Sequence, residues 1–302
     1  MSPSESYRGV FTIPSTPFTE TLDLDLPSLR RIVDFCIGCG AHGLVYPVNA
    51  SSFSVLSDVE RIQASKAVVE QCAGRIPVVI GVAGVSKEHA ASFAAEARAM
   101  GADAVIAMTP YVSKIKDEGL VVDYYQAIAD AVQRPVFIQN HTVGSELSIG
   151  TLARVVREVD HVHYIKEETF PVTHKLSGVL SEAGPKLRGV FGGAGGRFLL
   201  LEHPRGVAGQ MPGCHVTDVV VRLWNALESG NMAEALHVYG ALAPLYALEN
   251  QWVGNCYKEI LRIRGVIECT RTRNVTDSVD DEDRRALKAT VAALEPFFTW
   301  HR

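Results

Sequence analysis

Residues 135–166 read PVFIQNHTVGSELSIGTLARVVREVDHVHYIK and predict one strand–helix–strand unit. An apolar run bounded by turn residues opens the segment at 135–140, and a second such run closes it at 162–166. Between them, residues 149–159 carry apolar side chains at helical spacing, and Ser148 directly before them is a typical helix N-cap. We therefore expect two parallel strands joined by a helix.

Eight apolar runs of this kind recur up to residue 210, and stretches with helical spacing separate them. This alternation is typical of a parallel sheet, and eight near-continuous apolar strands favour an α/β fold of the closed (β/α)8 type, the TIM barrel, over an open sheet. The predicted strands are 9–16, 43–48, 77–82, 104–108, 135–140, 162–166, 188–193 and 205–210. The predicted helices are 26–39, 58–73, 87–100, 121–132, 149–159, 174–183 and a short one at 196–203.

Beyond residue 210 the sequence predicts helices alone, at 218–228, 232–248, 257–264 and 280–298. No Pro-, Gly- or Ser-rich linker precedes them, so an independent second domain is not indicated. We expect residues 1–228 to form the barrel and residues 229–302 to form a C-terminal helical appendage packed on it.

The composition is that of a globular protein with a large core, since 47% of the 302 residues are apolar and 21% are charged. The net charge of −5 is spread along the chain without a basic block, so neither nucleic acid nor an anionic membrane is an expected partner. The first residues lack a basic segment followed by an apolar one, and no apolar run reaches membrane-spanning length. A cytoplasmic location is expected.

The cysteines and histidines do not predict a metal site. Cys36 and Cys39 have C-x-x-C spacing, but they lie in an apolar-periodic run without a second Cys or His pair, which favours core packing over a metal or redox site. His141, His163 and His215 also lack the spacing of metal ligands. We expect neither a metal nor a cofactor.

In a TIM barrel the loops at the carboxyl ends of the strands converge on the active site. Polar residues at these positions are therefore the candidates for chemistry. Lys166, Glu168 and Gln139 are the candidate catalytic residues. The candidate substrate-binding residues are Thr16, Asn49, Ala50, Ser51, Ser52, Tyr111, His141, Gly193 and Gln210.

Lys166 lies in the hexapeptide YIKEET (164–169), where an apolar segment is followed by two carboxylates. Burial inside a barrel disfavours an ammonium ion and favours the neutral amine, which attacks a ketone to form a Schiff base. The resulting iminium is an electron sink that makes a neighbouring C–H bond acidic or a neighbouring C–C bond breakable. A lysine that reaches solvent from a strand end is the alternative reading, and the carboxyl-end position of Lys166 favours the nucleophile.

Glu168 is the candidate base, because a side chain two residues beyond Lys166 on a strand projects to the same face. The barrel interior is expected to raise its carboxyl pKa, which suits a group that returns a proton to a leaving hydroxyl. Alternatively, Glu168 caps a turn or pairs with a basic residue such as His174. Glu167 is expected to point the other way and to be structural. Gln139 is able to orient a hydroxyl or a water molecule but not to take up a proton.

Asn49, Ser51 and Ser52 form a small polar turn after the second predicted strand, and such a turn presents several hydrogen-bond donors to a substrate carboxylate. The alternative is an ordinary helix-entry loop in which Ser57 caps the following helix. Gly193 belongs to a glycine-rich run that allows close approach of a substrate near the seventh strand.

Across essentially its whole length the chain resembles the dihydrodipicolinate synthase and N-acetylneuraminate lyase superfamily. The resemblance implies a class I enzyme that acts on 2-oxo acids through a Schiff base at Lys166, usually as a homotetramer. The segments that carry it are GVFTIPSTPF (9–18), GLVYPVNASSFSVLSDVER (43–61), VIAMTPY (105–111), PVFIQN (135–140), YIKEET (164–169), FGGAGG (191–196) and GVAGQMPG (206–213).

The chain departs from the synthase and the sialate lyase at the positions that bind carboxylate and move protons. Their Thr-Thr-Gly-Glu or Ser-Thr-Gly-Glu turn is replaced by Asn-Ala-Ser-Ser at 49–52, and their tyrosine at the end of the fifth strand is replaced by Gln139. A second tyrosine of the synthase falls at Val112, and the synthase arginine after the fifth strand has no counterpart in residues 141–148. These departures argue against lysine-pathway synthase activity.

The same departures occur in a branch of 2-keto-3-deoxy-pentonate dehydratases, which the chain also resembles in the C-terminal segments LENQW (248–252) and RGVIECTRTR (264–273). That resemblance implies dehydration of a 2-keto-3-deoxy sugar acid such as L-2-keto-3-deoxyarabonate. The residues shared with the branch are Asn49, Ser51, Gln139, Lys166, Glu168 and Thr169.

Two other functions fit the same residues. A class I aldolase would use the same iminium to cleave a C–C bond and release pyruvate. A barrel that binds a 2-oxo acid without catalysis would also be compatible with the missing tyrosines.

Overall fold

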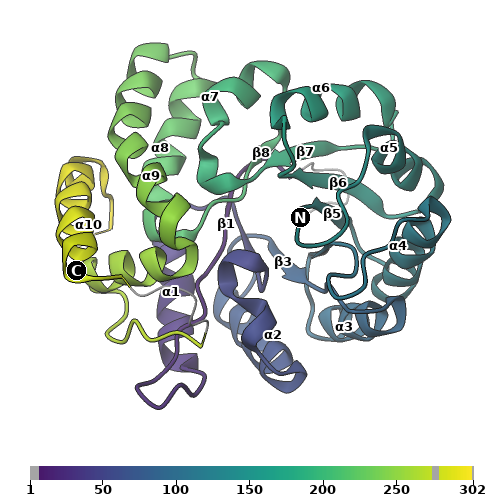
Figure 1. Ribbon diagram of the computed structural model, residues 1–302, viewed down its shortest axis with the longest axis horizontal. Coiled ribbons are helices and arrows are strands. Elements are labelled where there is room, and N and C mark those ends of the chain that lie inside the picture. The colour runs from purple at the N-terminus through teal and green to yellow at the C-terminus, as the bar shows by residue number, and fades with distance from the viewer. Residues whose placement is uncertain (1–6, 274–278, 301–302) are drawn as a thin grey trace. The chain divides into compact units, whose positions relative to one another are not determined.

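The computed structural model describes residues 7–273 and 279–300 and shows a closed barrel whose strands follow one another in sequence order (Figure 1). The described ladders between neighbouring strands are parallel, and helices alternate with the strands. The predicted TIM barrel is therefore confirmed. The strands are β1 (Gly9–Thr12), β2 (Gly43–Tyr46), β3 (Val78–Gly81), β4 (Ala104–Ala107), β5 (Val136–Asn140), β6 (Val162–Glu167), β7 (Gly189–Gly192) and β8 (Gly209–Gln210).

The helices of the barrel begin and end close to their predicted bounds. Several begin at a side chain that accepts a hydrogen bond from the helix backbone, as Ser86, Asp117 and Ser148 do, because the first N–H groups of a helix otherwise lack partners. The helices are α1 (Leu26–Gly38), α2 (Asp58–Cys72), α3 (Lys87–Ala99), α4 (Glu118–Val132), α5 (Ile149–Glu158), α6 (Val172–Glu182), α7 (Leu199–Glu202) and α8 (Thr217–Glu228).

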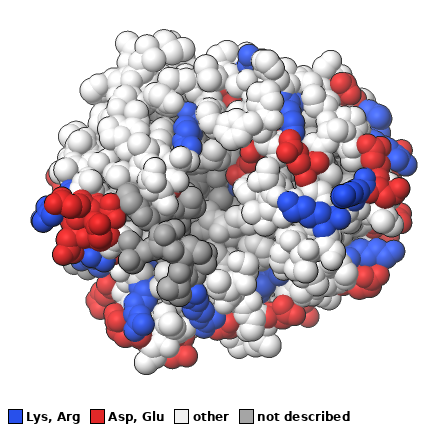
Figure 2. All heavy atoms as spheres, in the orientation of Figure 1, with Lys and Arg blue, Asp and Glu red and all other residues white. Residues whose placement is uncertain are grey.

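The C-terminal region differs from the prediction in two respects. The two helices expected at 232–248 and 257–264 are a single helix, α9 (Met232–Ile263), which continues through Pro244 and through the polar residues near Asn250. Helix α10 (Asp281–Leu294) lies beside α9 (Figure 1) and replaces the expected 280–298 helix, whose end is a short 3-10 turn. Acidic side chains gather at the start of α10 in Figure 2, where they face the positive end of the helix dipole.

The chain divides into two compact units. The central unit comprises Pro77–Met211 with the described part of Met1–Gly9, and it contains β3 to β8 with the helices between them. The terminal unit comprises Val10–Ile76 with the described part of Pro212–Arg302, so it joins β2, α1 and α2 to the helices that follow β8. The domain boundary expected at residue 228 stays a prediction.

Aromatic rings form the core of the central unit on the same strand face as Lys166. Tyr164 lies two residues before Lys166 on β6 and stacks on Phe137 of β5, with ring centroids 4.4 Å apart. Phe191 of β7 packs edge-on against Phe137 at 5.5 Å, and all three side chains are fully buried. The Lys166 side chain therefore extends from a rigid, apolar layer.

In the terminal unit the C-terminal segment is anchored to α1 and α8. Arg264, just after α9, forms a buried ion pair with Asp218 of α8 at 2.6 Å, and its guanidinium lies over the ring of Phe35 of α1. Gly38 has no room for a β-carbon because the Trp300 ring occupies that space. Cys36 and Cys39 are buried free thiols of the same unit, as expected for core packing.

None of the helices in the described residues is both long enough and apolar enough to cross a membrane.

Candidate active site

Strand β6 places Lys166 and Glu168 on one face, and β5 adds Gln139 beside them. In the sheet register Gln139 pairs with Lys166, and Lys166 pairs with Phe191 of β7, so these three side chains share the face that carries the aromatic core. Glu168 follows the last residue of β6, and its backbone N–H donates to the carbonyl of Asn140 at 3.0 Å. Its position is thus fixed by an extension of the β5–β6 ladder.

The three predicted catalytic residues are in direct contact. Lys166 Nζ lies 3.1 Å from Glu168 Oε1, and Gln139 Nε2 donates to Glu168 Oε2 at 2.7 Å. The Lys166 side chain is 4% exposed and that of Glu168 is 12% exposed, so the ion pair is largely shielded from water. Glu168 therefore pairs with Lys166, not with the alternative partner His174. The predicted inward orientation of Lys166 agrees with this geometry, and the reading as a solvent-exposed lysine does not.

The expected rise in the pKa of Glu168 was wrong. Burial does raise the pKa of this carboxyl, but the charges of Lys166 and His141 and the hydrogen bond from Gln139 outweigh it, and the net pKa lies below the ordinary value. Sequence reasoning considered the apolar setting of Glu168 and omitted the ammonium beside it. The carboxyl is thus ionised and able to accept a proton.

His141 lies close enough to this pair to interact with it electrostatically. Burial lowers its pKa and the nearby Lys166 acts in the same direction, while Glu168 opposes them, and the net shift is downward. Its Nδ1 accepts a hydrogen bond from the backbone N–H of Val143 at 3.0 Å, which assigns the proton of the neutral ring to Nε2. The neutral His141 ring thus carries its N–H donor at Nε2.

Gly193 provides the space that Glu168 occupies. A β-carbon at Gly193 would collide with the Glu168 carboxyl group, so only glycine fits there without moving the proposed base. The predicted close approach of a substrate at Gly193 stays a prediction. Tyr111 is half-buried in the loop after β4, and its proposed contact with substrate stays a prediction.

Glu167 points to the opposite face of β6, as predicted. Its carboxylate accepts hydrogen bonds from Asn140 Nδ2 at 2.8 Å, from the backbone N–H of Thr169 at 2.7 Å and from the Thr169 hydroxyl at 2.6 Å. Lys175 in turn donates to the Thr169 hydroxyl at 2.5 Å. This network fixes the backbone on both sides of Glu168.

The remaining predicted residues lie in the terminal unit, where Thr16 and Ser51 are in contact. The Thr16 hydroxyl donates to the Ser51 carbonyl at 2.6 Å and accepts from the Tyr46 hydroxyl at 2.9 Å. Asn49, Ala50 and Ser51 form a 3-10 turn directly after β2, and Ser52 ends it in a left-handed conformation with φ 57°. The predicted sequence of polar residues thus forms a compact turn. Tyr46 is a member of this network that the sequence analysis did not identify.

Two donors of this turn are available for a ligand. Within residues 7–273 and 279–300, neither Asn49 Nδ2 nor Ser51 Oγ has a hydrogen-bond partner, although both atoms are buried. Buried polar groups are normally paired, so these two donors are candidates for a substrate carboxylate, and that contact stays a prediction. Ser57 caps α2 as the alternative reading expected, and the two observations are compatible.

The profile of the Dihydrodipicolinate synthetase family matches residues 6–294. The chain belongs to this family. It is 31% identical over 299 residues to an L-2-keto-3-deoxyarabonate dehydratase of Azospirillum brasilense, covering 98% of this chain and 97% of that protein. A probable 2-dehydro-3-deoxy-D-pentonate aldolase of Escherichia coli K12 is 32% identical over 172 residues, which are 56% of this chain and 57% of that one.

Solved structures agree on the fold. The dihydrodipicolinate synthase of Aquifex aeolicus superposes with a TM-score of 0.88 at 21% identity, covering 97% of this chain and 99% of that one. As a member of the dihydrodipicolinate synthetase family, the chain is a Schiff-base-forming lyase, and members of this family bind small 2-oxo acids and form oligomers.

The Gln210 side chain does not join Lys166, Glu168 and Gln139. It pairs in register with Gly192, which pairs with Glu167, so its side chain is on the strand face opposite Lys166. There Gln210 Nε2 donates to Glu202 of α7, and both side chains are buried. Gln210 thus contacts Glu202, and its proposed contact with substrate stays a prediction.

Glu202 was not identified from the sequence, where it is the one carboxylate in the apolar segment LLLEH (199–203). Burial raises its pKa to about 7, the bond from Gln210 opposes this rise, and the negative charges of Glu168 and Glu167 add to it. Because this pKa exceeds the ordinary value of 4.5, the folded protein holds a proton that the unfolded chain releases between those values. The neutral carboxyl group therefore makes its full contribution to the free energy of unfolding at pH values below 4.5. This contribution declines as the pH rises through about 7.

Replacing Glu202 with glutamine is expected to remove this decline. The free energy of unfolding, measured by urea denaturation at pH values between about 5 and 8, should fall with pH in the wild type and fall less in Glu202→Gln. The exposed Glu182→Gln is the matched control and should keep the wild-type slope. An unchanged slope in Glu202→Gln would show that Glu202 does not carry the proton.

Proposed function

We propose that this chain dehydrates a 2-keto-3-deoxy sugar acid, with L-2-keto-3-deoxyarabonate as the first candidate, through a Schiff base on Lys166. The observation that carries the proposal is the buried contact of Lys166 with Glu168, which Gln139 holds in place. A full-length relative named as an L-2-keto-3-deoxyarabonate dehydratase supports the choice of substrate.

Schiff-base formation begins with a proton transfer between the paired residues. Lys166 must lose a proton before its amine attacks the C2 ketone, and the Glu168 carboxylate 3.1 Å away is positioned to accept it. The carbinolamine hydroxyl then takes this proton from Glu168 and leaves as water, which forms the iminium and restores the Glu168 carboxylate. Glu168 is ionised because the positive charge beside it lowers its pKa, so the base is present in the resting enzyme.

Dehydration then follows from the acidity of C3. A base removes one C3 proton, the electron pair forms an enamine, and the enamine expels the C4 hydroxyl, which leaves as water after accepting a proton. Glu168 serves as base and then as acid in this scheme, and Gln139 orients its carboxylate without exchanging a proton itself. Tautomerisation and hydrolysis of the imine release 2-oxoglutarate semialdehyde and restore the Lys166 amine.

The turn after β2 is the proposed carboxylate-binding element. Asn49 Nδ2 and the Ser51 hydroxyl are unpaired donors within the described residues, and a carboxylate accepts several such bonds. Thr16 supports the turn through its bond to the Ser51 carbonyl, so its proposed role is to hold the turn. Ala50 and Ser52 would contribute backbone groups of the same turn.

Product analysis tests the proposed reaction. The enzyme is incubated with L-2-keto-3-deoxyarabonate, and 2-oxoglutarate semialdehyde and pyruvate are quantified separately. The semialdehyde is the expected product, and pyruvate with glycolaldehyde would instead identify a class I aldolase. The assay includes this second function because the Escherichia coli relative is named as a probable aldolase.

Borohydride trapping separates both lyase functions from a binding protein without catalysis. Pyruvate or the sugar acid should add irreversibly to Lys166 when borohydride is present. A protein that binds these compounds but forms no adduct and no product would be a non-catalytic barrel. We also propose that the chain assembles as a homotetramer, which light scattering after size-exclusion chromatography measures.

A further inference from the structure

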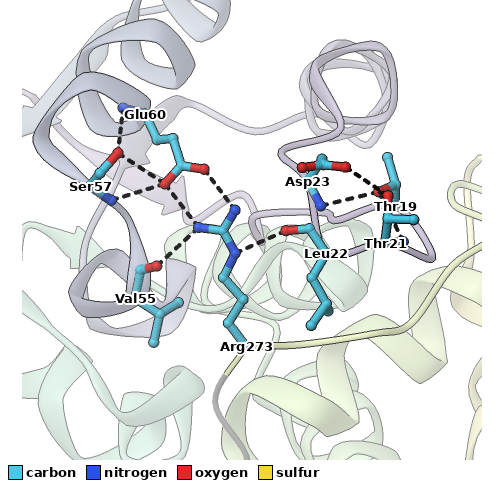
Figure 3. Close-up of polar contacts among 8 residues, drawn as sticks. All are labelled: Thr19, Thr21, Leu22, Asp23, Val55, Ser57, Glu60 and Arg273. Carbon is cyan, nitrogen blue, oxygen red and sulfur yellow. Dashed lines mark hydrogen bonds and ion pairs between the residues drawn. The ribbon is translucent and has the colours of Figure 1, made fainter.

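Arg273 ends the segment RGVIECTRTR (264–273), and its guanidinium binds three separate parts of the terminal unit (Figure 3). Nε donates to the Leu22 carbonyl at 2.9 Å, and Nη1 donates to the Val55 carbonyl at 3.1 Å. Nη1 and Nη2 also reach the two carboxylate oxygens of Glu60, at 2.8 and 2.6 Å. The three partners belong to the loop after β1, to the turns after β2 and to the first turn of α2.

These are the same loops that carry the proposed carboxylate-binding turn. Thr16 lies at the start of the loop that reaches Leu22, and its hydroxyl binds Ser51 in the turn that leads to Val55. The loop after β1 and the turns after β2 are therefore joined twice. Thr16 binds Ser51 at one point, and Arg273 binds Leu22 and Val55 at the other. The Arg273 guanidinium also lies 4.5 Å from the ring centre of the fully buried Phe18, two residues after Thr16.

The ion pair with Glu60 is well suited to hold these loops. A bidentate arginine–carboxylate pair fixes both distance and orientation, which a lysine at the same position would not reproduce. The side chains of Arg273 and Glu60 are 24% and 22% exposed, so solvent weakens the pair less than it weakens a surface ion pair. Glu60 also accepts from the backbone N–H of Ser57 and so completes the cap of α2.

We propose that Arg273 is a positioning residue that holds the Asn49–Ser52 turn in the geometry that binds the substrate carboxylate. The inference rests on the proposed function, because it assumes that this turn receives the carboxylate. Arg273 does not act on the reacting carbon atoms. Its loss should therefore weaken the binding of compounds that have a carboxylate and should leave Schiff-base chemistry at Lys166 intact.

The test compares two trapping reagents in wild type, Arg273→Lys and Arg273→Gln. Pyruvate carries a carboxylate, whereas hydroxyacetone is a ketone without one, and borohydride fixes either compound on Lys166. The pyruvate concentration that gives half-maximal trapping should rise about tenfold in both variants, which is the effect of losing about 1.4 kcal/mol of binding. The dependence on hydroxyacetone should stay within about twofold of wild type.

Two further variants test whether the weaker pyruvate binding arises from the loss of the Arg273–Glu60 ion pair. Arg271→Gln is the matched control, because this neighbouring arginine donates only to the Glu20 carbonyl among the described contacts; its loss leaves the bonds of Arg273 to Val55 and Glu60 in place and should change pyruvate trapping less than Arg273→Gln does. Glu60→Gln keeps an acceptor for Ser57 and loses the ion pair, so it should reproduce the weaker pyruvate dependence. The double variant Arg273→Gln/Glu60→Gln should be no worse than Arg273→Gln alone.

The outcomes separate this inference from the proposed function. If wild type forms no adduct with either compound, the proposed function fails and the inference fails with it. If wild type reacts at Lys166 and the variants show the wild-type dependence on pyruvate, only the role of Arg273 is refuted. Equal weakening toward pyruvate and hydroxyacetone would also refute it, because general damage to the fold does not distinguish the two compounds. Arg273→Lys serves this comparison if Arg273→Gln does not fold.

Discussion

Replacing Lys166 with alanine is expected to abolish adduct formation with pyruvate and to lower kcat/KM for the sugar acid by about 10⁴-fold or more. The Schiff base needs a primary amine at this position, and no other part of the mechanism proceeds without the iminium. Intact-mass spectrometry after borohydride treatment measures the adduct directly. Lys166→Arg is the matched variant, since a guanidinium keeps the positive charge beside Glu168 but is not a nucleophile at neutral pH.

The residue that carries the adduct must be identified, because Lys258 is a second candidate amine. Lys258 is also buried, and burial lowers its pKa to about 7. A large share of its amine is therefore neutral near pH 7 and able to react with a ketone. Its Nζ donates to the Arg271 carbonyl at 2.9 Å and lies over the Phe18 ring, where it has a structural role. Peptide mapping should find the adduct on the peptide that contains Lys166. An adduct on Lys258, or one that persists in Lys166→Ala, would overturn the proposed mechanism.

Glu168→Gln is expected to lower kcat by about 10²- to 10⁴-fold, while pyruvate still forms a trapped adduct, more slowly than in the wild type because the amide does not take the proton of Lys166. The amide keeps the shape and the contact with Gln139, but it cannot accept the C3 proton or return a proton to the leaving hydroxyl. Steady-state kinetics and trapping on the same preparation measure the two steps separately. A variant that retains wild-type kcat would assign the proton transfer to another group.

Glu168 is also expected to set the acidic limit of activity. Because the pKa of Glu168 lies below its ordinary value of 4.5, its carboxylate persists at pH values where a typical glutamate is protonated. The acidic fall in kcat/KM, which reports the free enzyme, should therefore lie below the ordinary carboxyl range. Glu167→Gln is the neighbouring control and should reduce stability through its bonds to Asn140 and Thr169, without changing this limit.

Most of the barrel was predictable because its strands are short apolar runs with turn residues on each side. Parallel strands buried on both faces need such runs, and β5 and β6 appear at the expected places. The long α9 was not predicted as one helix, since Pro244 and the polar residues near Asn250 interrupt its apolar periodicity. Packing against α8 and α10 supports a helix that its local sequence does not specify alone.

The candidate site was predictable where it depends on strand alternation. The spacing of Lys166 and Glu168 on one strand implies a shared face, and the contact between them follows from it. The shifted pKa of Glu168 depends on a balance of burial against neighbouring charge, which residue order does not reveal. The roles of Glu202 and Arg273 could not be predicted from the sequence, because the residues that they contact belong to other elements of the same unit.

One consequence of β6 concerns how this enzyme would acquire new substrates. The proposed nucleophile Lys166 and the proposed proton carrier Glu168 lie two residues apart at the end of β6, whereas the turn proposed to recognise the carboxylate follows a different strand. Selection can thus remodel recognition loops without altering the distance between amine and carboxylate. Directed evolution of substrate range should accordingly vary the loops after β2, β4 and β5 and leave residues 164–169 untouched.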